Sequence, residues 1–177
     1  MDLILVNEVD EPLGAMEKME VHQKGLLHRA FSVFVFNKKG EMLLQKRAAG
    51  KYHSPGLWTN SCCSHPQPGY EIIPAATLRL QEEMGFTTSL EKAFDFIYKV
   101  TFENGLTENE FDHVLLGNYD GVVTPNAEEV EDYRYLSLTE IKNLLQSNPS
   151  DYTHWFKIAI PKLEDYLASK TASGVIV

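Results

Sequence analysis

The chain has 177 residues, and its 16 lysines and arginines against 25 aspartates and glutamates give a formal net charge of −9. This length suits one domain, and 44% hydrophobic with 23% charged residues is ordinary globular composition, which excludes disordered and collagen-like chains. The acidic charge argues against a nucleic-acid partner, although a small anionic substrate could bind where the few cations gather in one pocket.

The cysteines and the apolar runs bear on the cellular compartment. The two cysteines are neighbours, Cys62 and Cys63, and therefore cannot link distant parts of a fold. The first residues lack the basic and apolar regions of a signal peptide, and the longest apolar run, around 31–36, is far shorter than a membrane span of ~20 residues. We therefore expect a soluble protein of the cytoplasm, with no membrane partner.

The strands are indicated by β-branched and aromatic runs between turn residues. They are expected at 3–7, 30–36, 41–45, 94–102 and 111–119. The second and third would form a hairpin through the Asn-Lys-Lys-Gly turn at 37–40, and 10–14 reads as another turn.

The helices are indicated by signals at their ends. The range 74–85 begins with a proline and ends with a glycine, and 137–145 begins with a capping box. A last helix is expected over about 153–170, with a bend or a restart at Pro161. The order of strands and helices indicates an α+β fold in a single domain over 1–177, with a frayed tail from about residue 171.

The segment 60–66 holds a dense group of reactive side chains. Cys63 precedes His65 by two residues, so an extended chain would put the thiol and the imidazole on one side. The segment alone is equally consistent with a buried small side chain beside an ordinary loop histidine. A nucleophilic Cys–His pair usually joins residues far apart in sequence, so this spacing gives it little support.

Carboxylates and imidazoles elsewhere suggest a metal site. Glu108 and Glu110 are two apart and share one face of a strand, although such a pair is more often a solvated edge. His22 and His28 precede the apolar strand, and each alone is more often a surface or core residue than a ligand. Together with His65, this set would suit Zn²⁺, Mn²⁺ or Fe²⁺ better than Mg²⁺, which prefers oxygen ligands.

Several charges near these segments could serve an anion site. Glu82 and Glu83 lie at the end of the helix expected over 74–85. A negative charge there opposes the helix dipole unless it is solvated or bound to a cation. Four cations lie close to the candidate site elements: Lys18, Arg47, Lys51 and Arg79. They could form an anion pocket, and a solvated scatter of charge is the alternative.

Taken together, these residues resemble those of the type I isopentenyl diphosphate isomerases, a branch of the Nudix fold. The stretch Trp-Thr-Asn-Ser-Cys-Cys-Ser-His-Pro at 58–66 is similar to the family signature W-T-N-S-x-C-x-H-P. Tyr98, followed ten residues later by Glu-Asn-Glu, is similar to a second signature. The resemblance runs from about residue 3 to 155. It implies a Nudix-like mixed β-sheet between helices, with an extra N-terminal strand or hairpin and C-terminal helices.

The resemblance also implies an enzyme of isoprenoid biosynthesis that converts isopentenyl diphosphate into dimethylallyl diphosphate. Its catalytic residues would be Cys63 and Glu110, assisted by Tyr98, with Cys62 a non-catalytic neighbour. One Zn²⁺ or Mn²⁺ per chain would be held by His22, His28, His65, Glu108 and Glu110. Glu83 and the backbone carbonyl of Cys63 would help to hold Mg²⁺ at the diphosphate.

The rest of the implied site binds the substrate. The diphosphate would be contacted by Lys18, Arg47, Lys51 and Arg79. Trp155 would face the hydrocarbon end. The partner is therefore a small prenyl diphosphate, and we expect a monomer or a weak homodimer.

The Nudix signature G-x5-E-x7-R-E-x2-E-E-x-G is only partly present. Its matching positions are Glu82, Glu83 and Gly85. Its departures are Ser64 for the first Gly, Tyr70 for the first Glu, and Leu78 and Arg79 for the Arg-Glu pair. Hydrolases of the superfamily use those carboxylates to bind metal and activate water, so their loss argues against a Nudix diphosphate hydrolase. A catalytically inert metal- or anion-binding module would not account for Cys63, Tyr98 and Glu110 together.

Overall fold

The computed structural model describes residues 1–51 and 53–172. Its strands are β1 (Asp2–Val6), β2 (Pro12–Glu17), β3 (His28–Phe36), β4 (Met42–Arg47), β5 (Trp58–Thr59), β6 (Cys62–Ser64), β7 (Leu90–Thr101), β8 (Thr107–Asn118) and β9 (Val130–Leu136). Its helices are α1 (Lys18–Lys24), α2 (Ile72–Met84), α3 (Leu138–Ser147), the short 3₁₀ helix η1 (Pro149–Asp151) and α4 (His154–Ala172). The fold is therefore α+β, as expected.

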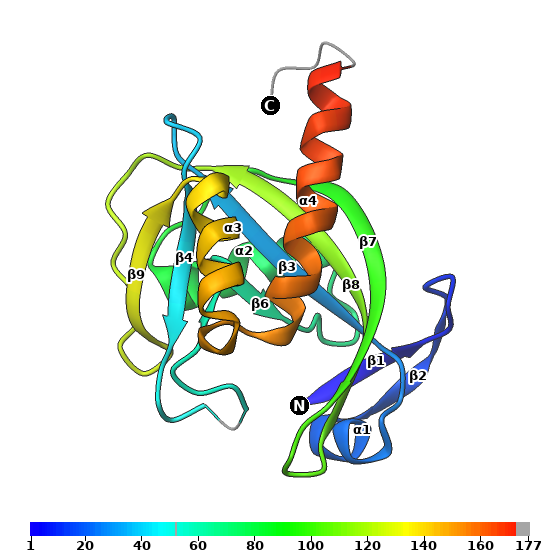
Figure 1. Ribbon diagram of the computed structural model, residues 1–177. Coiled ribbons are helices and arrows are strands. Elements are labelled where there is room, and N and C mark those ends of the chain that lie inside the picture. Colours follow the sequence, from blue (N-terminus) through cyan, green and yellow to red (C-terminus); the bar gives the residue numbers. More distant parts are fainter. Residues whose placement is uncertain (52, 173–177) are drawn as a thin grey trace.

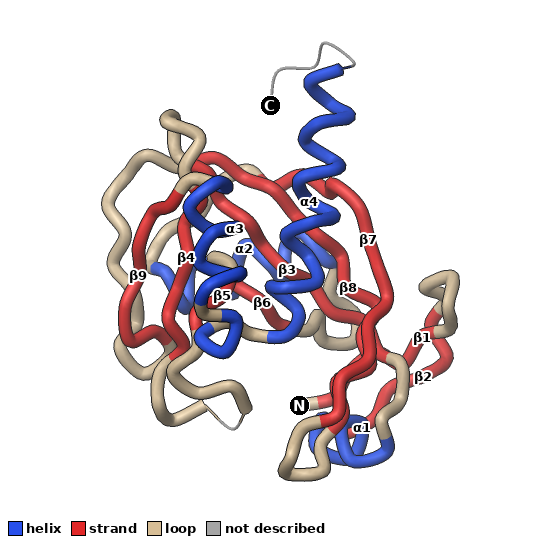
Figure 2. The backbone as a smooth tube through the Cα atoms, in the orientation of Figure 1, coloured by secondary structure: helices blue, strands red, loops and turns tan. Residues whose placement is uncertain are grey.

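Strand β3 is the centre of a mixed, curled sheet (Figures 1 and 2). Along one edge it pairs in parallel with β8, from His28 opposite Glu110 to Phe36 opposite Asn118. Its other edge is shared by antiparallel neighbours in turn: β1, β6 and β4. Strand β7 extends the sheet beyond β8, and β9 extends it beyond β4.

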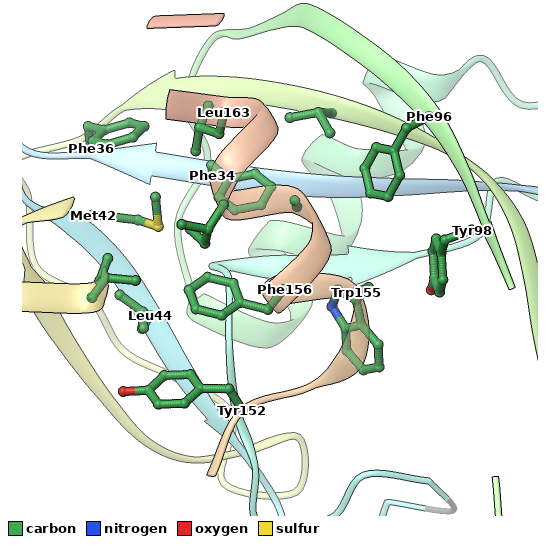
Figure 3. Close-up of a cluster of buried hydrophobic side chains, with 14 residues drawn as sticks. Phe34, Phe36, Met42, Leu44, Phe96, Tyr98, Tyr152, Trp155, Phe156 and Leu163 are labelled. Carbon is green, nitrogen blue, oxygen red and sulfur yellow. The ribbon is translucent and has the colours of Figure 1, made fainter. Parts of the chain in front are cut away.

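Helices cover both faces of this sheet, because alternate side chains of β3 and β4 point to opposite sides. On one face, Phe34 and Leu44 pack against α3 and α4, in the cluster shown in Figure 3. On the other face, Val33 and Leu43 pack against α2. Burial on both faces explains why β3 is mostly apolar from residue 30 onward, with no alternation of polar residues. Among the described residues, no helix is both long and apolar enough to cross a membrane.

The expected hairpin of β3 and β4 opens immediately after its turn. The two strands pair only at Phe36 and Met42, and the chain from β5 to β6 enters between them. β5 pairs with β4, and β6 pairs with β3. Ser61 joins the two strands here, since its Oγ accepts from Val35 N at 2.9 Å and donates to Leu43 O at 2.7 Å. The signature segment is thus built into the middle of the sheet.

Several helix predictions are confirmed. Helix α2 ends at Gly85, whose φ of 77° provides a left-handed cap. Ser137 and Glu140 form the predicted capping box of α3. Helix α4 continues through Pro161 without a restart. The predicted tail from 171 begins inside α4, and 173–177 lie outside the described residues.

Other local predictions were wrong. The range 10–14 is not wholly a turn, because Pro12–Gly14 belong to β2. This strand is almost entirely exposed, so it carries no apolar alternation to identify it. Strand β9 was not predicted, for a similar reason: its exposed positions carry mainly polar residues, so it shows no apolar alternation. Helix α1 has only seven residues, too few to show a helical period.

The segment β1–β2–α1, residues 2–24, forms what we call the N-terminal lobe. It projects from one end of the sheet in Figure 1. One backbone pairing, Leu5 with His28, joins it to β3. One small apolar cluster, containing Ile4, Val6 and Phe111, lies beneath it. Helix α1 of the lobe also packs against β8.

Candidate active site

One cleft gathers most of the side chains that the sequence singled out. It opens between the N-terminal lobe, the ends of β6 and β8, α2 and the start of α4. Its lining comprises Lys18, Phe31, Ser32, Arg47, Lys51, His53, Cys63, Ser64, His65, Arg79, Glu83, Tyr98, Glu108, Glu110 and Trp155. His22 and His28 are fully buried beside it. Residues from eight helices and strands and from two loops therefore meet in a single place.

Four potential metal ligands converge at the floor of this cleft. They are His22 of α1, His28 at the start of β3, His65 just after β6, and Glu110 of β8. One ligand atom from each lies within 4.8 Å of all the others. The sheet register brings His28 beside Glu110, and Nε2 of His65 lies 3.0 Å from Oε1 of Glu110. This donor set of imidazoles and one carboxylate fits a transition metal.

The backbone orients two of these imidazoles. Nδ1 of His22 lies 2.7 Å from the carbonyl of Lys18, and Nδ1 of His28 lies 2.9 Å from the carbonyl of Leu26. If each Nδ1 carries the proton, Nε2 is left as a lone-pair donor, the arrangement usual for histidines that bind metals. Burial also lowers the pKa of His22, and it lowers the pKa of His65 to about 4. Neutral imidazoles are the form that a metal requires.

Glu108 lies outside this four-residue group. Its Oε2 is 3.2 Å from the hydroxyl of Tyr98, and its Oε1 is 3.4 Å from Nε2 of His53. Burial, followed by the neighbouring charge of Glu110, raises the pKa of Glu108 well above its ordinary value. The structure therefore brings four of the five expected ligands together. The fifth, Glu108, lies two residues before Glu110 on the same face of β8.

Tyr98 and Glu110 are partners across the β7–β8 pair. They face each other in the strand register, and the Tyr98 hydroxyl donates to Oε2 of Glu110 at 2.7 Å. Burial by itself would raise the pKa of Glu110, but contacts with His28 and His65 lower it well below its ordinary value. Burial raises the pKa of Tyr98. An ionised carboxylate beside a protonated phenol can accept and relay a proton.

The adjacent cysteines have different surroundings. Cys62 is fully buried and packs with the α2-side cluster, whereas Cys63 lines the cleft. They point to opposite sides because β6 is extended, and Cys63 shares its side with His65. Burial raises the pKa of Cys63 to about 12, so its thiol keeps its proton at neutral pH. Only Cys63 can meet a molecule in the cleft.

The four predicted cations all line the cleft, and two of them share a carboxylate. Arg79 Nη2 lies 2.7 Å from Glu83 and 2.8 Å from Glu129, and Lys51 also pairs with Glu129. Burial lowers the pKa of both Lys18 and Lys51. Partly desolvated cations interact strongly with an anion, so the cleft favours a phosphate group.

Trp155 also lines the cleft and lies against one of the cations. Trp155 is 3% exposed, and its indole Nε1 donates to Oδ1 of Asn60 at 3.1 Å. The Arg47 guanidinium lies over the Trp155 ring, 5.3 Å from its centroid. Figure 3 shows Trp155 and Tyr98 at the margin of the buried cluster, away from its centre around Phe34. Both rings are therefore held rigidly at the border between core and cleft.

Some residues of the site were missed by sequence reasoning. Asp112 continues the 108, 110, 112 alternation and could have been found by its period; it accepts from Ser32 Oγ at 2.8 Å. Burial raises its pKa to about 8. His53, whose ring stacks on Phe102, and Glu129 lie in irregular segments where no sequence period could reveal them. Gln45, whose Nε2 donates to Glu83 Oε2 at 2.7 Å, reads in sequence as an ordinary strand residue.

Comparisons with known sequences identify relatives of this chain. The family profile described as NUDIX domain matches residues 26–156. Isopentenyl-diphosphate Delta-isomerase 2 of Photorhabdus laumondii is 52% identical over 155 residues, which cover 88% of this chain and 88% of the relative. Isopentenyl-diphosphate Delta-isomerase of Pectobacterium atrosepticum is 46% identical over 165 residues, which cover 93% of this chain and 92% of the relative.

Solved structures with the same fold are more distant in sequence. The crystal structure of DR0079 from Deinococcus radiodurans superposes with a TM-score of 0.75 at 18% identity, covering 92% of this chain and 98% of that one. The MutT protein from Methanosarcina mazei gives a TM-score of 0.64 at 18% identity, covering 78% and 94% respectively. At this identity the likeness shows the Nudix fold alone.

Proposed function

This chain belongs to the NUDIX domain proteins and, among them, to the isopentenyl-diphosphate Delta-isomerases, and on that premise we propose how its cleft serves the reaction. The enzyme converts isopentenyl diphosphate into dimethylallyl diphosphate, a step of isoprenoid biosynthesis. The observation that carries the proposal is that Cys63 and the Tyr98–Glu110 pair share one cleft with four cationic side chains and the indole of Trp155.

The isomerisation exchanges one proton for another. One carbon of the alkene gains a proton and a different carbon loses one, so the carbon skeleton and the overall composition are unchanged. The reaction therefore needs one protonated group and one ionised group beside the alkene. The neutral thiol of Cys63 and the carboxylate of Glu110 meet this requirement. Tyr98, whose hydroxyl donates to Glu110, would hold the carboxylate in place and could pass a proton between Glu110 and the alkene.

The intermediate of this reaction has the character of a tertiary carbocation, which water would trap. The cleft must therefore exclude water around the hydrocarbon. The indole of Trp155 is fixed by Asn60 and could stabilise positive charge with its face. These contacts support Trp155 as the residue at the hydrocarbon end.

A transition metal, Zn²⁺ or Mn²⁺, would be held by His22, His28, His65 and Glu110, with Glu108 as the fifth predicted ligand. When bound, the metal would stabilise the ionised form of Glu110 and fix its position. The chain contributes the orientation of the ligands through the Nδ1 contacts of His22 and His28.

The diphosphate would bind among the cationic side chains of the cleft. We assign its contacts to Lys18, Arg47, Lys51 and Arg79. Mg²⁺ would be held there by Glu83 and the carbonyl of Cys63, because diphosphate oxygens suit a hard cation. Binding of this group would orient the small hydrocarbon tail against Cys63 and Glu110.

The decisive experiment incubates the purified protein with isopentenyl diphosphate and Mg²⁺ and measures the dimethylallyl product. We expect isomerisation that is lost after exhaustive chelation and recovers with Zn²⁺ or Mn²⁺. Release of phosphate from prenyl or nucleoside diphosphates without isomerisation would instead identify a hydrolase. Activity that survives complete removal of the transition metal would contradict the role given to the four converging ligands.

The setting of the reaction is also part of the proposal. A reduced Cys63 thiol is needed, which favours the cytoplasm, where thiols remain reduced. We propose a monomer or a weak homodimer, because the candidate site is assembled from one chain. Sedimentation at several protein concentrations would test the oligomeric state.

A further inference from the structure

Two residues of the candidate site come from the N-terminal lobe. Lys18 lines the cleft at the start of α1, and His22 reaches the metal-ligand group one helical turn later. The backbone pairing of Leu5 with His28 and the small cluster around Phe111 attach the lobe to the sheet. The position of both site residues therefore depends on the contacts that hold the lobe against the sheet.

Asp10, in the turn between β1 and β2, makes contacts across the gap between lobe and sheet. Its Oδ1 accepts from Arg29 Nε at 2.7 Å, and its backbone carbonyl accepts from Arg29 Nη2 at 2.7 Å. Its Oδ2 lies 3.0 Å from Nε2 of His113. Arg29 belongs to β3 and His113 to β8, so Asp10 is hydrogen-bonded to one central strand and in close contact, without a hydrogen bond, with the other.

These contacts are shielded from water. The exposed fractions of the side chains are 18% for Arg29, 23% for Asp10 and 2% for His113. Exposed ion pairs contribute little, but a pair that is mostly buried and hydrogen-bonded through two separate nitrogens leaves uncompensated groups when one partner is removed. The cluster can therefore fix the lobe more firmly than an ordinary surface ion pair.

The backbone of Asp10 supports a specific role for its side chain. Its φ is 64°, in the left-handed region that glycine adopts without cost. Aspartate and asparagine tolerate this conformation better than other non-glycine residues. An aspartate here accepts a mild backbone cost and provides a carboxylate that glycine would lack.

We propose that Asp10 is a positioning residue, which fastens the β1–β2 turn to β3 through Arg29 and thereby holds Lys18 and His22 at the candidate site. The proposal deepens the function proposed above and rests on it for the roles of those two residues. Asp10 itself does not touch the cleft. Its effect reaches the site through β2, which leads directly into α1.

The test compares Asp10→Asn with Glu8→Gln in the full chain. Both variants remove one negative charge from the same turn, and asparagine keeps the left-handed backbone accessible. Glu8 is exposed, so its replacement controls for net charge alone. Three quantities are measured: Co²⁺ affinity of the metal-free protein by visible absorption, amide hydrogen exchange over residues 2–24, and the steady-state constants for isopentenyl diphosphate.

We expect Asp10→Asn to weaken Co²⁺ binding by about tenfold at most, because the amide oxygen can still accept from Arg29 and only the charge that strengthens this contact is lost. Exchange in the lobe should accelerate, and KM should rise more than kcat falls. Glu8→Gln should match the unaltered protein in every measurement. If Asp10→Asn accelerates exchange but leaves Co²⁺ affinity and KM unchanged, Asp10 only stabilises the lobe and the proposal fails. It fails equally if the two variants behave alike.

A second variant covers the case in which Asp10→Asn does not fold. Arg29→Lys keeps the positive charge but loses the two-point contact with Asp10, and it should show the same pattern with a smaller shift in Co²⁺ affinity. Unchanged affinity in this variant would overturn the proposal. Co²⁺ binding and hydrogen exchange do not depend on isomerase activity. Failure of the proposed function would therefore appear as absent turnover with these two measurements still interpretable.

Discussion

The N-terminal lobe and the central sheet contribute to the candidate site in different ways. The sheet supplies Cys63, Tyr98 and Glu110 from strands β6, β7 and β8, which pair directly or through β3. The lobe supplies Lys18 and His22 from the seven-residue helix α1, and its strand β1 pairs with the sheet at one position, Leu5 with His28. The NUDIX match begins at residue 26, so it includes the sheet residues and leaves out the lobe.

This difference suggests a division of tasks. Groups that exchange protons must be held within a few tenths of an ångström, and paired strands between two apolar clusters provide that rigidity. Groups that capture an anion tolerate more movement, because charge interactions fall slowly with distance, whereas a metal ligand must be placed closely for the metal to bind. We therefore expect changes in the sheet to act mainly on kcat, and changes in the lobe to act mainly on binding.

The largest effect is expected from Glu110→Gln. This change keeps the shape of the side chain but removes both the proton acceptor and one ligand of the metal group. Loss of a general acid or base costs about 10²–10⁴-fold, and here kcat should approach the upper end. Steady-state kinetics with metal content measured in parallel provides the check, and Glu103→Gln, in the exposed turn of the same hairpin, is the control. A near-normal kcat in metal-loaded Glu110→Gln would exclude the role assigned to this carboxylate.

Cys63→Ala should reduce kcat by about 10²–10⁴-fold without unfolding the protein. Its neighbour offers a matched control: Cys62→Ala removes a fully buried sulfur from the α2-side cluster and should cost about 1 kcal/mol of stability with most activity retained. Kinetics and chemical denaturation of the two variants separate these effects. Equal losses of activity would show that the two thiols have been assigned incorrectly.

Arg79→Ala should act on capture of the diphosphate. Arg79 faces the cleft from α2, one turn before Glu83, with which it pairs at 2.7 Å. A charged hydrogen bond contributes about 1.5–3 kcal/mol, so kcat/KM should fall about 10- to 150-fold, mostly through KM. Lys142→Ala, which breaks an exposed pair with Glu164, is the control for general loss of positive charge. An unchanged KM in Arg79→Ala would show that this residue does not bind the diphosphate.

His22→Asn should have the smallest effect and compares lobe with sheet most directly. His65 follows a strand at the centre of the sheet, whereas His22 belongs to the lobe, so the lobe ligand should contribute less to metal affinity. We expect about a tenfold loss for His22→Asn and a larger loss for His65→Asn. Titration of both metal-free variants with Zn²⁺ in the presence of a competing chelator measures this. A larger loss of Zn²⁺ affinity in His22→Asn than in His65→Asn would contradict the proposed difference between lobe and sheet.

Much of the fold followed from local signals in the sequence. The apolar run of β3, the capping box of α3 and the glycine that ends α2 each act within a few residues, so they could be predicted correctly. The exposed strands β2 and β9 could not, because an edge strand with polar residues on its surface lacks a hydrophobic period. The opening of the β3–β4 hairpin was also hidden, since it depends on where a later segment inserts.

The site shows the same boundary between sequence and structure. The sequence by itself determined the types of group available: a thiol and an imidazole two residues apart, alternating carboxylates, and a few cations in an acidic chain. Only the tertiary structure decided which of them meet, because His22, His28, His65 and Glu110 approach within 4.8 Å through the parallel pairing of β3 with β8 and the docking of the lobe. It also left Glu108 outside that group. Such choices depend on contacts between residues far apart in the chain, which no local period or spacing encodes.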